Sequence, residues 1–190
     1  HMWELYAMWT WVPTYLLVAA AGGVSINATN AAFTGFERLA FAALSGAGTT
    51  SIGATFSGAQ FDVGLITKTG LLVIASAVTD ALTIRDISGN FDVSGWTFLG
   101  WSASDVLYLG GDGGANILTT KATVAATLIG EGGADQLFGG NLSDQLYGSN
   151  SAADGAQDDM TGGNGGDVYN VYELIDLIHE NAPDTGTDYA

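Results

Sequence analysis

A repeat of nine residues is the feature that most constrains how this chain can fold. The repeat is clearest near the C-terminus and weaker before it. Its units are GWSASDVLY (100–108), GDGGANILT (111–119), KATVAATLI (121–129), GEGGADQLF (130–138), GGNLSDQLY (139–147), a copy with a five-residue insertion near Ala152 (148–161), and GGNGGDVYN (162–170). A unit this short cannot bury its own apolar face, so the pattern predicts a stack of repeated turns and strands.

Each unit has the same layout: a glycine-rich turn of six residues that usually closes on an acidic residue, then a three-residue strand with an apolar centre. The sixth positions are Asp105, Asn116, Ala126, Asp135, Asp144, Asp158 and Asp167. The eighth positions are Leu107, Leu118, Leu128, Leu137, Leu146, Met160 and Tyr169. Because every eighth position is apolar, this column is predicted to form the core.

Two units make one flattened coil, and stacked coils lie about 4.8 Å apart. Alternate units therefore stack, which predicts one edge with Asn116, Asp135 and Asp158. The opposite edge is predicted to carry, in order, Asp105, Ala126, Asp144 and Asp167. Each slot between stacked turns is lined by glycine-turn carbonyls and acid side chains. Such an anionic, all-oxygen slot suits Ca²⁺, which takes roughly six to eight oxygen ligands.

We expect about three calcium ions, all in the C-terminal half. The Asp135/Asp158 and Asp144/Asp167 slots are the stronger ones, although the insertion is expected to loosen the first. The Asn116/Asp135 slot is weaker, and Ala126 is expected to weaken or empty the slots beside it. Apart from these acids and Asn116, the candidate ligands are turn residues: Gly111, Gly113, Gly130, Gly132, Gly139, Asn141, Gly148, Asn150, Gly162 and Asn164.

Charge supports a cationic ligand. The chain has twenty acidic and four basic residues, a net charge of −16. Residues 100–190 hold fourteen of the acids and one base, Lys121, a net of −13, and such a segment repels itself when compact unless cations bind. Nucleic acid is excluded as a partner because no basic surface can be assembled. The absence of cysteine excludes disulfides and thiolate metal sites.

The rest of the chain is predicted to continue the stack. Residues 1–2 are interpreted as a cloning remnant, and the apolar run at 15–21 is too short to span a bilayer. Residues 3–99 are expected to form a calcium-poor β-solenoid with an N-terminal cap, 100–170 the calcium-binding roll, and 171–190 a terminal cap whose pattern fits a short helix or a strand. The expected strands of the first half are 15–18, 24–27, 38–44, 54–58, 71–75, 81–84, 90–93 and 96–99. The predicted fold is all-β: one right-handed parallel β-roll or β-solenoid.

Aromatic and acidic residues outside the repeat have plain interpretations. Trp3, Trp9 and Trp11 are expected to cover the open N-terminal end, with sugar stacking or membrane contact as the alternative. Trp96 and Trp101 are expected to pack internally. The acids expected to be solvated are Asp112, Glu131, Asp154 and Asp159, whereas Asp176 and Glu180 are expected either to be solvated or to cap the last calcium edge.

Catalysis is not expected. The sequence contains no G-x-S-x-G, no H-E-x-x-H and no plausible Ser/His/Asp set. His179 has no histidine or cysteine partner nearby, so a surface position is expected. The four basic residues are too scattered for a cleft that binds acidic sugars.

The unit GGNGGDVYN matches the nonapeptide G-G-x-G-x-D-x-U-x, and this part of the chain resembles the RTX (repeats-in-toxin, hemolysin-type) calcium-binding proteins. GGNLSDQLY and GEGGADQLF each lack one glycine. The tail after 166 is similar to the segment that follows the last repeat in such proteins, and FTGFERLAF is similar to their calcium-free linking coils. The resemblance implies export of an unfolded chain by type I secretion, followed by calcium-driven folding outside the cell.

The expected function is thus that of a secreted, monomeric and non-catalytic calcium-binding module, which folds on binding extracellular Ca²⁺ and supports the secretion and stability of a larger bacterial protein. Two alternatives share the fold, because fold does not fix function. One is an adhesin or polysaccharide-binding solenoid with a cell-surface ligand. The other is an auxiliary domain of a secreted lipase, protease or alginate epimerase. A run of ordinary Asx turns without calcium is the simplest competing interpretation of the repeat.

Overall fold

The computed structural model describes residues 15–20, 24–29, 36–43, 51–62, 70–150, 152–181 and 187–190. The fold is all-β with parallel sheets, as the sequence predicts. The chain divides into two compact units. Unit 1 comprises His1–Thr83 and Gly95–Val106, and unit 2 comprises Ile84–Ser94 and Leu107–Ala190.

Unit 1 contains a parallel sheet in the order β1-β3-β5-β8 and a second parallel pair, β2 with β4. These strands agree well with the apolar runs expected from the sequence. Their bounds are β1 Tyr15–Ala20, β2 Val24–Asn27, β3 Arg38–Ala43, β4 Ser51–Ser57, β5 Leu72–Ile74 and β8 Thr97–Leu99, and β6 (Thr79–Ile87) begins in this unit.

A single helical turn, α1 (Ala59–Asp62), follows β4. Ser57 Oγ accepts the Ala59 N–H at 3.2 Å, and Gln60 Oε1 accepts the Ser57 N–H at 2.9 Å. This exchange resembles a capping box, which satisfies the first free N–H groups of a helix. The sequence prediction omitted this helix, although the Ser57-x-x-Gln60 spacing signals it.

Aromatic rings fill the core of unit 1. Trp96 is fully buried and stacks on Phe61 with the ring centroids 5.6 Å apart. Trp101 meets Phe98 edge to face at 5.1 Å. The expected internal packing of Trp96 and Trp101 is therefore confirmed, whereas Trp3, Trp9 and Trp11 lie outside the described residues.

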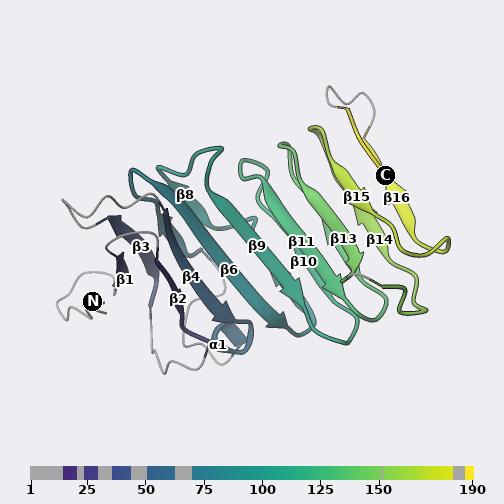
Figure 1. Ribbon diagram of the computed structural model, residues 1–190, viewed down its shortest axis with the longest axis horizontal. Coiled ribbons are helices and arrows are strands. Elements are labelled where there is room, and N and C mark those ends of the chain that lie inside the picture. Colours follow the sequence, from purple (N-terminus) through teal and green to yellow (C-terminus); the bar gives the residue numbers. More distant parts are fainter. Residues whose placement is uncertain are drawn as a thin grey trace. The chain divides into compact units, whose positions relative to one another are not determined.

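Unit 2 contains two sheets made from alternate strands of the chain (Figure 1). One follows the order β16-β14-β12-β10-β7, and in the other β15, β13, β11 and β9 are neighbours in that order. The bounds are β7 Asn90–Asp92, β9 Val106–Gly111, β10 Ile117–Thr119, β11 Ala126–Glu131, β12 Gln136–Phe138, β13 Gln145–Ser149, β14 Asp159–Thr161, β15 Val168–Asn170 and β16 Leu177–His179. Stacking of alternate repeat units is thus confirmed.

The predicted core column splits between these two sheets. In the first, the register aligns Phe91, Leu118, Leu137, Met160 and Ile178. In the second, it aligns Leu109, Leu128, Leu146 and Tyr169. All are buried except Ile178, so side chains that alternate along each strand point into one apolar interior.

One predicted alignment is wrong. Asp105 and Ala126 were expected in the same column, but Ala126 pairs with Leu107 and Leu128 pairs with Leu109. The register is therefore shifted by two residues. Leu107 and Leu109 are both apolar and fully buried, and a two-residue shift keeps the same side chains facing the core.

The tail after the last repeat forms a strand, β16, which settles the ambiguity of the sequence pattern at 177–179. It pairs with β14 through Leu177↔Asp159, Ile178↔Met160 and His179↔Thr161. Residues 171–176 are outside any strand or helix. The tail therefore extends the five-stranded sheet by one strand.

The core column predicts a sharp contrast between two leucines of unit 2. Leu137 is fully buried, so Leu137→Ala should lower the free energy of unfolding by about 2–5 kcal/mol. Leu142 is 43% exposed in a turn, so Leu142→Ala should change it by less than about 0.5 kcal/mol. Urea unfolding monitored by circular dichroism measures both, and equal losses would contradict the alignment.

Candidate metal centre

A column of hydrogen bonds runs through the turns that precede β10, β12, β14 and β16. In each step, a side-chain oxygen accepts the backbone N–H of the residue at the same place one coil earlier. Asp135 Oδ1 accepts from Asn116 at 2.7 Å, and Asp158 Oδ1 accepts from Asp135 at 2.9 Å. Asp176 Oδ1 accepts from Asp158 at 3.1 Å. We call Asn116, Asp135, Asp158 and Asp176 the first acid column.

The turns that precede β11, β13 and β15 form the second acid column, Ala126, Asp144, Asp167 and Asp188. Asp144 Oδ1 accepts the Ala126 N–H at 2.7 Å, and Asp167 Oδ1 accepts the Asp144 N–H at 2.8 Å. Asp188 Oδ1 accepts the Asp167 N–H at 2.9 Å. The structure therefore brings together the acids that the sequence placed on each edge, Asp105 excepted.

The insertion in the 148–161 unit does not break the first acid column. The Asp135–Asp158 hydrogen bond has ordinary length, although these residues are 23 positions apart. Asp154, within the longer turn, accepts the N–H groups of Gly133 at 2.6 Å and Ala156 at 2.9 Å. The hydrogen bond between stacked turns is therefore kept across the insertion, and Asp154 links the longer turn to the turn that contains Gly133.

The first glycine of each turn lies against the acid that closes the same turn. A methyl group at Gly130 would collide with Asp135 Oδ2 and with the Gly148 carbonyl oxygen. At Gly139, it would collide with the Gly162 carbonyl oxygen and lie 2.7 Å from Asp144 Oδ2. The same crowding occurs at Gly111, Gly148 and Gly162. Carboxylate and carbonyl oxygens thus converge where only glycine leaves room.

Asp135 shows that these carboxylates are not fully satisfied by the protein. Its Oδ1 accepts the Asn116 N–H, but among the described residues its buried Oδ2 has no hydrogen-bond partner. Burying a charged oxygen without a partner costs free energy. A cation bound beside Gly130 and Gly148 would offset this free-energy cost.

Burial shifts the acids toward their neutral form. It raises the pKa of Asp135 and Asp144 to about 7 and that of Asp158 to about 6, from an ordinary value of 3.8. Backbone hydrogen bonds oppose the shift, and neighbouring acids add to it: Asp158 acts on Asp135, and Asp167 acts on Asp144. Opposite charge near a carboxylate lowers its pKa, so a cation in these turns would reverse the shift.

Asn116 changes the chemistry of its slot. Its Oδ1 accepts the Asp112 N–H at 3.0 Å, and its Nδ2 donates to the Ile87 carbonyl at 3.0 Å. The amide carries no charge and satisfies itself within the protein. This arrangement agrees with the expectation of a weaker cation slot between Asn116 and Asp135.

The other predicted turn ligands make different contacts. Gly113 has open space where a side chain would stand, and Gly132 makes only ordinary contacts there. Asn164 Nδ2 donates to Asn141 Oδ1 at 3.1 Å, and Asn150 Nδ2 donates to Glu131 Oε1 at 3.3 Å. These asparagine hydrogen bonds involve residues outside the two acid columns.

Sequence reasoning missed two acids that belong to this pattern, Asp80 and Asp188, and left Asp176 open. Asp188 was not considered because residues 171–190 lack the nonapeptide. In unit 1, Asp105 Oδ1 accepts the Asp80 N–H at 2.7 Å, which repeats the contact seen in the columns. The Asp-x-apolar order at Asp80-Ala-Leu and Asp176-Leu-Ile was an available signal.

A third acidic group lies at the end of the second acid column. Ligand atoms of Asp167, Glu180 and Asp188 lie within 4.8 Å of one another, a spacing that could hold a metal ion. Glu180 also accepts a hydrogen bond from the buried Tyr169 hydroxyl, which in turn accepts the Gly162 N–H at 2.8 Å. Glu180 is thereby tied to the last repeat.

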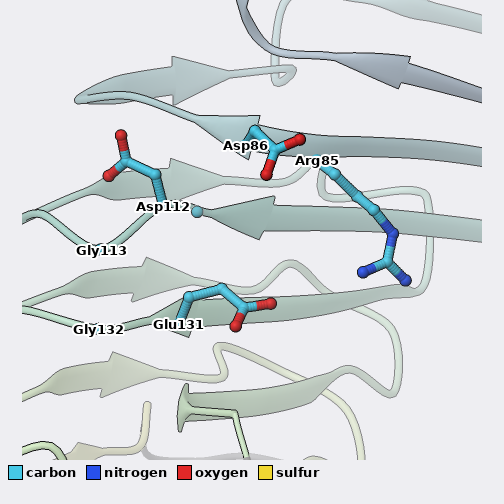
Figure 2. Close-up of a pocket in the computed structure, with 7 residues that line it drawn as sticks. Arg85, Asp86, Asp112, Gly113, Glu131 and Gly132 are labelled. Atoms are coloured by element: carbon cyan, nitrogen blue, oxygen red, sulfur yellow. The ribbon is translucent and has the colours of Figure 1, made fainter. Parts of the chain in front are cut away.

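A separate cleft of about 480 Å³ opens beside the first acid column, lined by Arg85, Asp86, Gly111, Asp112, Gly113, Glu131 and Gly132. Figure 2 shows its three acids on neighbouring segments, with the Arg85 side chain extending away from Asp112. The Arg85 guanidinium lies 4.5 Å from the centre of the Tyr108 ring. Asp86 and Glu131 hold left-handed backbone conformations, with φ of 53° and 78°. The expectation that Asp112 and Glu131 are solvated fits their position in this open cleft.

No protein-family model, curated protein or solved structure matches this chain. Within the part of the chain that the structure describes, no helix has the length and apolar character needed to cross a bilayer. The features that bear on function are therefore internal to the chain: the two acid columns of unit 2 and the glycines beside them.

The crowding at the first glycine of each turn predicts a strong effect of one methyl group. Gly139→Ala should lower the free energy of unfolding by several kcal/mol, because backbone oxygen cannot move aside cheaply. Gly113→Ala, in a comparable turn with open space, is the matched control and should change it by less than about 0.5 kcal/mol. Urea unfolding in calcium measures both. A harmless Gly139→Ala would contradict the close approach of the two turns.

The raised pKa values predict how the metal-free chain depends on pH. Asp135 and Asp144 titrate near pH 7 in the folded chain and near 4 when unfolded, so between these values the folded chain binds more protons. With a chelator present, the chain should therefore be coil-like at pH 7 and shift toward the β-rich folded form as the pH falls to 4. Circular dichroism at several pH values measures this shift.

Asp144→Asn should flatten part of this profile, whereas the exposed Asp92→Asn should leave it unchanged. A metal-free chain whose stability instead increases from pH 4 to 7 would show that these acids are not buried as charges.

Proposed function

We propose that this chain is a calcium-binding structural module of the RTX type, which folds on binding Ca²⁺ outside the cell and supports the secretion and stability of a larger protein. In this proposal, the parallel sheets form one right-handed β-roll, the module is monomeric and non-catalytic, and calcium is its ligand. The acid columns of unit 2 are the calcium-binding edges.

The observation that carries the proposal is the pair of acid columns. Buried carboxylates recur at the same place in successive turns, and their pKa values are raised by burial and by one another. Negative charges arranged in this way oppose the compact state unless a cation offsets them. With no basic residue after Lys121, the protein itself does not supply that cation.

The donor set fits calcium. The groups around the first glycines are carboxylate and carbonyl oxygens, which hard cations prefer, and cysteine is absent from the chain. Asp135 with the Gly148 carbonyl would hold one ion, and Asp144 with the Gly162 carbonyl another. The Asn116 turn, with one charge fewer, would hold a third more weakly. Bound Ca²⁺ supplies positive charge that neutralises the acids and links successive turns.

Unit 1 supports the contrast between calcium-poor and calcium-binding parts. Asp80 is buried, but both its carboxylate oxygens are satisfied: Oδ2 accepts the Ser76 N–H at 2.5 Å, and Oδ1 accepts the Ser76 hydroxyl at 2.9 Å. Asp105 Oδ2 likewise accepts the Ser102 N–H at 2.6 Å. These two acids of unit 1 are thus satisfied within the protein, whereas Asp135 in unit 2 keeps one buried oxygen without a partner among the described residues.

Metal binding and folding are one process in this proposal. Where the site forms only in the folded state, the binding free energy adds to the folding free energy. Calcium at the millimolar level typical of extracellular modules would then hold the compact form, and the low calcium inside a cell would leave unit 2 expanded. This behaviour suits a protein exported before it folds.

Calcium titration with chelator reversal tests the proposal. Circular dichroism should change from coil-like in chelator to β-rich in millimolar calcium, and calorimetry should count about three bound ions. Asp144→Ala and Asp167→Ala should each remove about one ion, because each supplies a carboxylate to the same slot.

Asp105→Ala is the matched control: it removes a buried acid that belongs to neither acid column, so the number of bound ions should stay the same. Identical spectra with and without calcium, together with no measurable binding heat, would exclude the proposed function.

A further inference from the structure

Exposed apolar side chains gather at the C-terminal tail. Ten large apolar side chains are exposed in the described part of the chain, and seven of them lie in the tail: Val171, Tyr172, Leu174, Ile175, Leu177, Ile178 and Tyr189. Leu174 is 105% exposed, and all three residues of β16 are exposed. We call these seven residues the tail patch. A concentration of this kind marks an interaction surface more often than scattered exposed leucines do.

The tail patch includes Leu177 and Ile178 of β16, a strand at an open sheet edge. β16 is the last strand of its sheet, and of the described strands only β14 pairs with it (Figure 1). The Leu177 N–H donates to the carbonyl of Asp158, the residue just before β14, at 2.8 Å. Because backbone groups of successive residues in a strand point to opposite sides, the N–H and C=O of Ile178 face the open edge.

Ile178 also shows that a further strand would fit there. It continues the column of Phe91, Leu118, Leu137 and Met160, whose members are at most 1% exposed, yet it is itself 38% exposed. The difference arises because a following strand covers each of the others. An additional strand beside β16 would bury Ile178 and satisfy the open backbone groups together.

The charge around the tail patch determines which strand would bind. Residues 122–190 contain twelve acidic residues and no lysine or arginine. Glu173, Asp176 and Glu180 alternate with the apolar residues of the tail patch. A second copy would bring the same negative charge to the same edge, and an anionic membrane would also be repelled. Only a partner that combines apolar and basic side chains complements this surface.

We propose that β16 and the tail patch form a docking edge for an extended segment of another protein, in which apolar and basic residues alternate. The segment adds a strand to the five-stranded sheet. Its apolar side chains cover Ile178 and Leu174, and its lysine or arginine side chains lie near Glu173 and Glu180. The backbone hydrogen bonds supply affinity, and the charges exclude acidic strands.

A peptide-binding experiment with folded protein tests this docking edge. The probe is a fluorescent nine-residue peptide of alternating valine and lysine, and the measurement is fluorescence anisotropy in calcium at about 0.15 M salt. The Leu174→Ser/Ile178→Ser variant should bind about tenfold more weakly than the wild type, because it loses apolar contact at unchanged charge. The Leu99→Ser/Leu142→Ser variant, altered at exposed leucines elsewhere, should bind within about twofold of the wild type.

A second peptide, with proline at its centre, distinguishes binding by strand pairing from binding by charge attraction. It keeps the lysines but cannot form a continuous strand, so it should bind about tenfold more weakly. Equal binding of both peptides, or of both double variants, would overturn the proposal in favour of attraction by charge alone.

Light scattering tests whether a second copy of this chain binds at the docking edge instead of another protein. A wild-type dimer that becomes a monomer in the Leu174→Ser/Ile178→Ser variant would also overturn the proposal. Circular dichroism of each variant in calcium verifies folding, and Leu174→Ser alone, at a fully exposed position, keeps the test valid if the double variant is unfolded. None of these outcomes depends on how many calcium ions are bound.

Discussion

The fold of unit 2 depends on one repeated contact: a buried carboxylate oxygen that accepts the N–H of the residue one coil earlier. This contact fixes where each turn lies over the next, since the acceptor, the donor and the strand that follows belong to one rigid segment. It also concentrates negative charge in the protein interior. The same interaction that aligns the turns therefore makes the compact state costly without cations.

The buried acids have different surroundings in turns that begin with glycine and in turns that contain serine. Where a turn begins with glycine, as at Gly130 and Gly139, the acid oxygen lies against bare backbone and the next turn's carbonyl. Where serine is in the turn, as at Ser76, its N–H and hydroxyl donate hydrogen bonds to the Asp80 carboxylate. In the first arrangement, Asp135 keeps one oxygen without a partner among the described residues, whereas in the second each oxygen of Asp80 has a partner. In the proposed function, calcium would bind beside the first kind of turn and not beside the second.

The two sheets of unit 2 differ at their C-terminal ends. The last repeat departs from the others at its eighth position, where Tyr169 replaces leucine or methionine and its hydroxyl bonds to Gly162 and Glu180. Beyond β15, the segment 187–190 continues this sheet through the parallel bridge between Val168 and Tyr189. The other sheet ends in β16 with Ile178 half covered, so the two sheets of unit 2 end differently.

The sequence by itself determined the strands, the apolar column and the stacking of alternate units, because a nine-residue period and an apolar residue at each eighth position leave few other ways to bury the core. It also identified Asp135, Asp144, Asp158 and Asp167. Only the tertiary structure decided the two-residue shift beside Ala126, since hydrogen-bonded register responds to the length of each connecting turn as well as to the period. The roles of acids in the non-repetitive tail, and the exposure of its apolar residues, likewise depend on which strand has a neighbour, and a local pattern does not contain that information.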